Sequence, residues 1–308
     1  MFSSKRGATI CGLVAIFMWS TAGGLIRSIS ETFGPIGGAA LIYSLGAAFL
    51  IAVLGRPRLR GASVFYLIAG GGLFVLYEVC MSLSLGYATS HQQAIEIGVV
   101  NYLWPSLTVL IAVLMNGQRA TWLIAPGTGL AVFGIVWVVC GDDLFLRALS
   151  ASVGENPIVF SLALACSLAF ALYCNVTRRY GGTGNQIVLF FIFTAAVLWI
   201  KYALSDERLN TFSLGNGVEL ALAVLSVAGG YALWNTGITR GNLTLLTTAS
   251  YFAPVLSSAF SAIWLSTTLA LQFWQGTLLV TAGSLICWLA TRSRDMRQVT
   301  TDVLSRES

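Results

Sequence analysis

Ten long apolar stretches follow one another along this chain of 308 residues, with short connections between them. Each has about the 17 to 25 residues that an α-helix needs to cross a hydrocarbon core roughly 30 Å thick. Barrel strands would appear as alternating segments of about ten residues, whereas these stretches are apolar on all sides. The sequence therefore predicts an all-α integral membrane protein. The predicted transmembrane helices lie at 7–26, 36–54, 62–86, 94–115, 122–140, 158–177, 185–203, 217–239, 244–267 and 270–291.

Positive charge is concentrated at the N-terminus and in every second connection, where thirteen of the seventeen Lys and Arg residues lie. The other connections hold only Arg27, Arg147, Lys201 and Arg208, together with most of the acidic residues. By the positive-inside rule, both termini are cytoplasmic. An odd number of helices would place the termini on opposite sides and spoil this segregation, so the pattern also supports an even count.

Composition excludes several classes of function. Charged residues make up only 9% of the chain, and the formal net charge of +5 is accounted for by the cytoplasmic connections, so the sequence predicts no nucleic-acid partner. Neither a phosphate-binding loop nor a metalloprotease or serine-hydrolase motif occurs, and the cysteines lack metal-ligand spacing. We therefore expect no catalytic residues, no metal and no cofactor.

The second half of the chain repeats the first. The segment Asn101-Tyr102-Leu103-Trp104-Pro105 is followed 149 positions later by Ser250-Tyr251-Phe252-Ala253-Pro254, and the same offset carries Gly127 onto Gly276 and Gly134 onto Gly283. Each half then contains five helices, and an odd number inverts the second half in the membrane. Inverted repeats of this kind are typical of secondary transporters. The predicted organisation is a first repeat at 1–145, a second, inverted repeat at 146–292 and a cytoplasmic polar tail at 293–308.

Pro105 and Pro254 lie about half way along the fourth and ninth predicted helices. A proline there removes a backbone hydrogen bond and kinks the helix. Such a kink can serve packing alone, since proline is common in membrane helices. The symmetry of the two kinks, each with a tyrosine three residues earlier, favours a role in lining a cavity.

Polar and aromatic side chains well inside the spans are expected to face the interior of the bundle, because they are costly in lipid. They are densest on the third, fourth, eighth and ninth helices, which form two symmetry-related pairs. The predicted substrate contacts are Trp19, Tyr77, Glu78, Met81, Asn101, Tyr102, Tyr173, Tyr231, Trp234, Asn235 and Tyr251.

Glu78 is the one carboxylate well inside a predicted span. A charged group at that depth marks an ion or substrate pathway by default, which makes Glu78 the candidate for proton coupling. The alternative is a protonated acid that only makes a hydrogen bond to a neighbouring helix. Glu96 and His91, the sole histidine, lie near the outer end of the fourth helix, where water can reach them.

Ten spans in two halves, Trp19-Ser20 in the first helix, and proline in the fourth and ninth helices resemble the drug/metabolite transporter superfamily of EamA type. The stretch from Gln93 to Gly98, followed by Asn101 to Pro105, is similar to that in the YddG-type exporters of aromatic amino acids. The resemblance covers residues 7–292, and it implies a bacterial inner-membrane exporter of aromatic and other amino acids or amphipathic compounds.

The residues alone indicate an aromatic, modestly polar cavity suited to a flat amphipathic solute. We expect a secondary transporter working by alternating access, as a monomer in the lipid bilayer with a small-molecule substrate. A proton-coupled multidrug-type exporter is the alternative. An intramembrane enzyme would need more than one deep carboxylate, and a channel would need a continuous polar ring.

Overall fold

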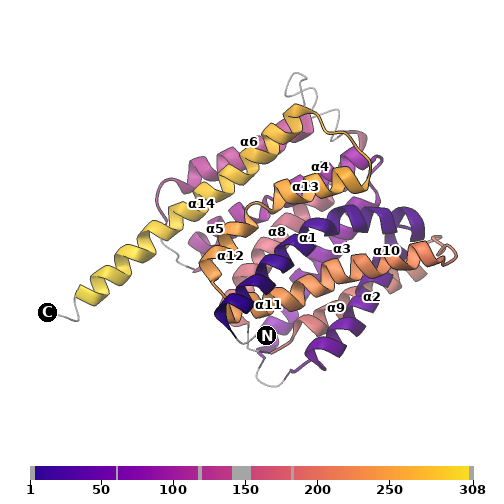
Figure 1. The fold of residues 1–308 in the computed structure, drawn as a ribbon, viewed down its shortest axis with the longest axis horizontal. Coiled ribbons are helices and arrows are strands. Elements are labelled where there is room, and N and C mark those ends of the chain that lie inside the picture. Colours follow the sequence, from indigo (N-terminus) through magenta and orange to yellow (C-terminus); the bar gives the residue numbers. More distant parts are fainter. Residues whose placement is uncertain (1–3, 60–61, 117–119, 141–153, 182–183, 305–308) are drawn as a thin grey trace.

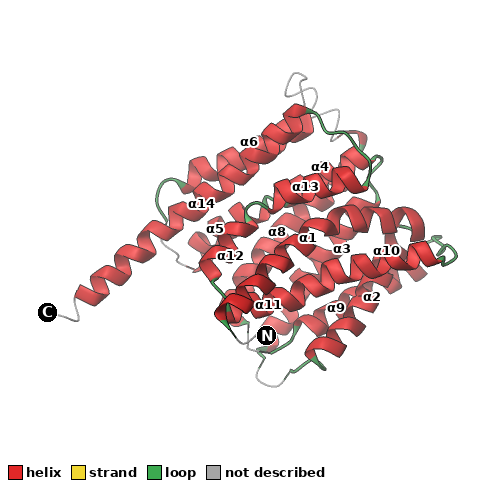
Figure 2. Cartoon of the chain, viewed as in Figure 1, coloured by secondary structure: helices red, strands yellow, loops and turns green. Residues whose placement is uncertain are grey.

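The computed structural model describes residues 4–59, 62–116, 120–140, 154–181 and 184–304. In this part the chain consists of helices joined by short connections and contains no strand (Figure 2). Seven helical segments are long and apolar enough to cross a membrane, and three more are apolar but shorter. The described residues thus confirm the all-α class and supply the ten apolar segments that the sequence predicts.

The helices of the first half are α1 (Lys5–Phe33), α2 (Pro35–Leu54), η1 (Tyr66–Gly70) continued by α3 (Gly71–Gly86), α4 (His91–Asn101), α5 (Trp104–Asn116) and α6 (Ile124–Cys140). Those of the second half are α8 (Pro157–Tyr180), α9 (Ile187–Ala203), α10 (Leu214–Val224), η2 (Leu225–Gly229), α11 (Gly230–Arg240), α12 (Leu243–Ser250), α13 (Ala253–Trp264) and α14 (Leu271–Leu304). The η segments are single π-helical turns inside longer helices.

Two helices extend beyond the predicted spans. The first continues past residue 26 to Phe33 and stops only at Gly34, whose φ of 85° is a conformation that glycine adopts without strain. Pro35 then begins α2, where its missing N–H costs no hydrogen bond. The last helix continues past residue 291 to Leu304, so the segment predicted as a polar tail is largely helical.

Both helices predicted to be kinked by proline are in fact interrupted. The fourth span ends as α4 at Asn101 and resumes as α5 at Trp104, and the ninth breaks between Ser250 and Ala253. Pro105 and Pro254 each lie in the first turn of the resumed helix, a position that tolerates proline. Each break therefore falls at the residues just before the proline.

Most of the helices form one body, while α6 and α14 lie side by side at its edge (Figure 1). The α6 and α14 backbones approach closely at two glycine pairs: a Cβ on Gly134 would lie 2.7 Å from the Gly276 carbonyl oxygen, and one on Gly283 would lie 2.6 Å from that of Gly127. Small residues permit this kind of helix contact in lipid.

Large apolar side chains cover much of the outside of the body. Ile68 is 72% exposed, Leu114 75% and Ile263 81%. In water such a surface would drive aggregation, whereas lipid chains solvate it. The chain is accordingly a membrane protein. The interior is also largely apolar, and Arg27 and Glu78 are the buried charged residues among those that the structure describes.

Candidate functional site

Glu78 on α3 lies in the middle of the helical body and is only 4% exposed. Both of its carboxylate oxygens accept hydrogen bonds from tyrosines of other helices. The hydroxyl of Tyr231 on α11 donates to Oε1 over 2.8 Å, and that of Tyr43 on α2 donates to Oε2. The carboxylate thus joins a helix of the second half to two helices of the first.

Burial of an unpaired carboxylate in an apolar interior costs on the order of several kcal/mol. The hydrogen bonds from the two phenols offset this cost, which explains how Glu78 can be accommodated here. Hydrogen bonds to a charged acceptor are also stronger than those between neutral groups. Ser82, one turn further along α3, is likewise buried and lies on the same face of the helix.

Aromatic rings surround the Glu78 carboxylate on the α11 side. The ring of Trp19 on α1 lies 5.0 Å from that of Tyr231, edge to face, and 5.4 Å from that of Trp234. Gly230 makes room for the indole, because a Cβ there would lie 2.5 Å from Trp19 Nε1. The first and eighth spans therefore meet at three aromatic rings beside the Glu78 carboxylate.

A second group of rings continues from these three rings toward α8. Phe74 packs edge to face against both Tyr231 and Tyr173, with 5.5 Å between ring centroids in each pair. Tyr77 lies 4.4 Å from Phe170 on α8. We use the name aromatic cluster for Trp19, Phe74, Tyr77, Phe170, Tyr173, Tyr231 and Trp234 together.

The break between α4 and α5 lies against α8. The hydroxyl of Ser167 is 3.2 Å from the Asn101 carbonyl oxygen, which has no helical donor because Pro105, four residues on, carries no N–H. The Asn101 side chain accepts a hydrogen bond from the Cys166 thiol over 3.1 Å. That thiol is also 4.0 Å from the sulfur of Met81.

Tyr102 and Tyr251 lie in the two breaks themselves. Tyr102 packs against the apolar core, and α4 contacts α13, which connects the fourth and ninth spans. The Tyr251 ring is 6.3 Å from that of Trp288 on α14 and has no ring contact with the aromatic cluster among the described residues.

The structure thus brings most of the predicted contacts together. Trp19, Glu78, Tyr231 and Trp234 meet directly. A neighbouring group around α8 contains Tyr77, Met81, Asn101 and Tyr173. Tyr251 is directed toward α14, while the side chain of Asn235 lies outside the described part of the structure.

Sequence reasoning missed Tyr43, which donates directly to Glu78. The signal was present, because Tyr43 lies well inside the second predicted span and is completely buried. Phe74, Phe170, Cys166 and Ser167 were also missed. Phenylalanine, cysteine and serine are ordinary in membrane helices, so only their three-dimensional neighbours distinguish them.

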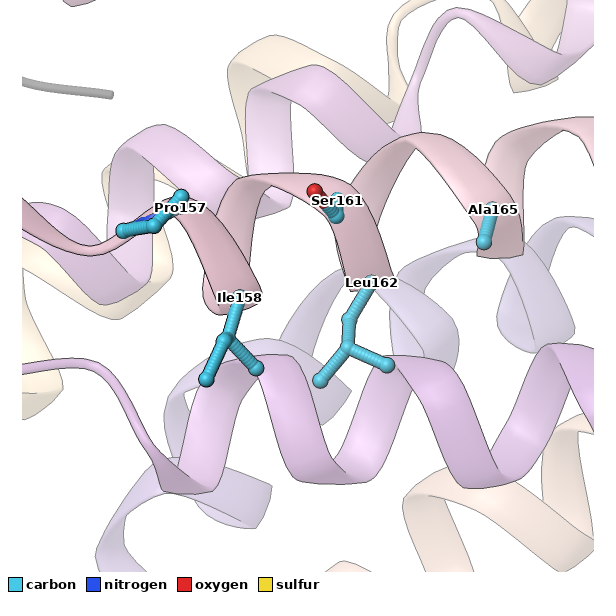
Figure 3. A pocket seen from close by; sticks show the side chains of 5 residues that line it. All are labelled: Pro157, Ile158, Ser161, Leu162 and Ala165. Carbon is cyan, nitrogen blue, oxygen red and sulfur yellow. The ribbon is translucent and has the colours of Figure 1, made fainter. Parts of the chain in front are cut away.

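A cavity of about 400 Å³ lies elsewhere, along the first turns of α8 (Figure 3). The residues that line it are Pro157, Ile158, Ser161, Leu162 and Ala165. This cavity is open and apolar, and it contains neither a charged group nor any of the predicted contacts. The exposed Ile158 beside it is typical of a surface that faces lipid, so this cavity is a poor match for a polar solute.

A carboxylate amid aromatic rings can bind an ammonium group by charge and an aromatic side chain by edge and face contacts. Together with the apolar helices around it, this arrangement defines a membrane transporter of small molecules. The sequence profile of the EamA-like transporter family matches residues 6–140 and 157–289. The chain therefore belongs to the EamA-like transporter family, which confirms the prediction of a transporter and not an enzyme.

Named relatives are similar over nearly the whole chain. The aromatic amino acid exporter YddG of Escherichia coli (strain K12) is 48% identical over 290 residues, which cover 94% of this chain and 99% of that protein. The aromatic amino acid exporter YddG of Salmonella typhimurium is 49% identical over 292 residues, covering 94% of this chain and 100% of that protein. A solved crystal structure with 24% identity aligns with a TM-score of 0.66 over 94% of this chain and 99% of its own, and it shows the fold alone.

Proposed function

We propose that this protein exports aromatic amino acids, and other amino acids or small amphipathic metabolites, through a site around Glu78 by alternating access. The observation that carries the proposal is the buried Glu78 carboxylate with a phenol on each oxygen, set within the aromatic cluster. The names of the two relatives, both aromatic amino acid exporters, support the same substrate class.

In the proposed mode of binding, the ammonium group of the amino acid bonds to Glu78 and displaces the Tyr231 hydroxyl. Tyr231 is the more easily displaced of the two donors, because it is only partly buried and follows the π-helical turn η2. The side chain of the substrate then packs against Trp19 and Trp234. Aromatic pairs of this kind contribute about 0.5–1.5 kcal/mol each beyond the area they bury.

Glu78 is also the proposed site of proton coupling. One carboxylate can bind a proton or an ammonium group, but it cannot bind both with full strength. Alternation between the two would exchange a proton for a substrate. A facilitator that moves solutes down their own gradient would use the same carboxylate for affinity only.

The two five-helix halves, 1–145 and 146–292, are proposed to be inverted repeats. The contacts between the halves support this, since α1 packs on α11 and α3 on α8, and exchanging the halves converts one pair into the other. The same exchange relates the contact between Gly134 and Gly276 to that between Gly127 and Gly283. The substrate site then lies between the halves, near the centre of the membrane.

The protein is proposed to work as a monomer in the bacterial inner membrane, with both termini and the tail 293–308 in the cytoplasm. The segregation of positive charge supports this orientation. It places the connections 34, 87–90, 204–213 and 265–270 on the external side, and the connections 55–65 and 181–186 on the cytoplasmic side.

Counterflow in proteoliposomes tests the function. Vesicles loaded with unlabelled phenylalanine should take up labelled phenylalanine, and external tryptophan and tyrosine should compete. Phenylpropionate is phenylalanine without the ammonium group, so it should compete weakly. Equal competition by phenylpropionate would show that the ammonium group is not recognised, and failure of every amino acid to compete would reject the substrate class.

A further inference from the structure

His91, the first residue of α4, lies between two other helices near the external ends of the bundle. Its ring nitrogen Nε2 is 2.9 Å from Oε1 of Glu31 on α1. The other ring nitrogen, Nδ1, is 2.9 Å from the carbonyl oxygen of Leu265, which ends α13. The imidazole therefore bridges a helix of the first half and a helix of the second.

Both partners of the ring are hydrogen-bond acceptors. A carbonyl oxygen has no proton to donate, and neither does an ionised carboxylate. Neutral imidazole carries one N–H, so it could donate to only one partner and would point a lone pair at the other. Imidazolium carries two N–H groups and can donate to both at once.

We propose that His91 is a proton-binding site that latches the external ends of α1, α4 and α13 together. The bound proton completes the bridge. Its loss leaves one N–H, which stays with the charged acceptor Glu31, so the end of α13 is released. The His91 and Glu31 side chains are 40% and 39% exposed, so external water can deliver and remove the proton. This site is separate from Glu78, and the proposed function enters only through the orientation that makes this end external.

The latch extends to a fourth helix through Arg27. Its Nη2 lies 2.7 Å from the same Glu31 oxygen that faces His91. Its Nη1 is within hydrogen-bond distance of three carbonyl oxygens at the end of α3, those of Leu85, Gly86 and Ala88, at 3.1, 3.2 and 2.7 Å. A continuous polar chain thus runs from α13 through His91, Glu31 and Arg27 to α3.

Charges near His91 act in both directions. Glu31 and the C-terminal carbonyl groups of α13 are the negative groups beside His91, and Arg27 and the N-terminal end of α4 are the positive ones. The other helices packed on α4 are α3, α6 and α8. Tyr87 directly follows α3 and Glu155 lies two residues before α8, and neither makes a hydrogen bond or ion pair with His91 in the described part. Glu96, further along α4, accepts a hydrogen bond from Gln92 over 2.9 Å.

Nuclear magnetic resonance of the ring nitrogens tests the site directly, since the chain contains a single histidine. The full-length protein in lipid nanodiscs, purified through a tag without histidine, would carry ¹⁵N-labelled histidine. Within about pH 5 to 8, the range in which histidine changes charge, the low-pH spectrum should show both nitrogens protonated. At that pH Glu31→Gln should lower the doubly protonated fraction, while the control Glu96→Gln should match wild type. A ring that stays neutral to about pH 5, or no effect of Glu31→Gln, would overturn the proposal.

Spin labels test the latch without any substrate, so the result does not depend on the transport assay. Labels at the exposed positions Gln92 and Thr268, in a cysteine-free background, report the distance between the ends of α4 and α13. Raising the pH from about 5 to about 8 should shift the distribution to longer distances. In His91→Gln the distribution should not respond to pH. An identical distribution at both pH values in the wild-type background would show that proton binding does not hold these ends together.

Discussion

Tyr43 and Tyr231 differ in how firmly they hold Glu78. Tyr43 is completely buried, whereas Tyr231 is partly buried. In the proposed mode of binding, Tyr43 is a positioning residue for the carboxylate. Tyr231, in contact with Trp19, is the donor that the ligand replaces.

We expect Tyr43→Phe to lower the stability of the folded protein. The substitution keeps the ring and removes a hydrogen bond to a charged group, which is worth about 1.5–3 kcal/mol. Thermal unfolding in detergent, followed by the loss of the monodisperse species, measures the effect. Tyr180→Phe, at an exposed ring, serves as the control. Equal melting of the two variants would mean that the Tyr43 hydroxyl does not support Glu78.

Glu78→Gln should abolish accumulation driven by a proton gradient while leaving exchange measurable. Glutamine retains the shape and a hydrogen-bonding oxygen, but it cannot titrate or pair with an ammonium group. Loss of a charged hydrogen bond of about 1.5–3 kcal/mol weakens substrate affinity roughly 10- to 100-fold. Proteoliposome uptake with and without an imposed gradient separates the two effects. Accumulation at the wild-type level would remove Glu78 from the coupling role.

The sequence could predict which polar residues are deep in the membrane, because the ends of each apolar run show how far a residue lies from the membrane surface. It could not predict which of them meet. Tyr231 reaches Glu78 across 153 positions of sequence, and Trp19 reaches both Tyr231 and Trp234. Such pairs depend on how helices from opposite halves pack, which no local pattern records. Tyr43 could have been predicted as well, because it lies well inside the second predicted span.

Among the elements, α6 and α14 form a contact that leaves no room for a side chain. A Cβ on Gly134 would meet two backbone atoms, the Gly276 oxygen at 2.7 Å and the Val280 nitrogen at 2.8 Å. Gly129, on the same helix, has no atom within 4 Å of such a Cβ. The two glycines therefore provide a matched pair for mutation.

We expect Gly134→Ala to separate the two helices and to destabilise the protein by about 1–3 kcal/mol, the usual cost of overpacking. Gly129→Ala should be neutral or stabilising by up to about 1 kcal/mol, because alanine favours the helix. Thermal unfolding of the two variants measures the difference. A melting temperature of Gly134→Ala at or above that of Gly129→Ala would contradict this packing.

Helix positions were largely predictable, since each span is a continuous apolar run. Their ends were harder to predict. Arg27 and Glu31 were predicted to lie in a polar connection. They instead form an ion pair four residues apart on one face of α1, and the helix continues through them. The breaks before Pro105 and Pro254 were predicted as kinks, because a proline alone does not reveal how many preceding residues leave the helix.

Across the whole molecule, the orientation in the membrane follows from charge. Cysteines introduced at Thr211 and Ser63, both exposed, report the connections between α9 and α10 and between α2 and α3. In a cysteine-free background, a membrane-impermeant maleimide applied to intact cells should label position 211 and leave position 63 unlabelled. The reverse pattern would invert the topology and would place the His91 latch on the cytoplasmic side.

The substrate is proposed to bind at the aromatic cluster around Glu78. Phenylalanine counterflow in proteoliposomes, with Trp19→Ala and Trp234→Ala compared with Trp122→Ala, tests it most directly. Trp122 is 78% exposed and lies outside the cluster, so it controls for the loss of a tryptophan as such. We predict that the two cluster variants lose most of the exchange at equal amounts of folded protein while Trp122→Ala retains it. Loss in Trp122→Ala equal to that in the cluster variants, or full exchange in all three, would contradict the assignment of the site.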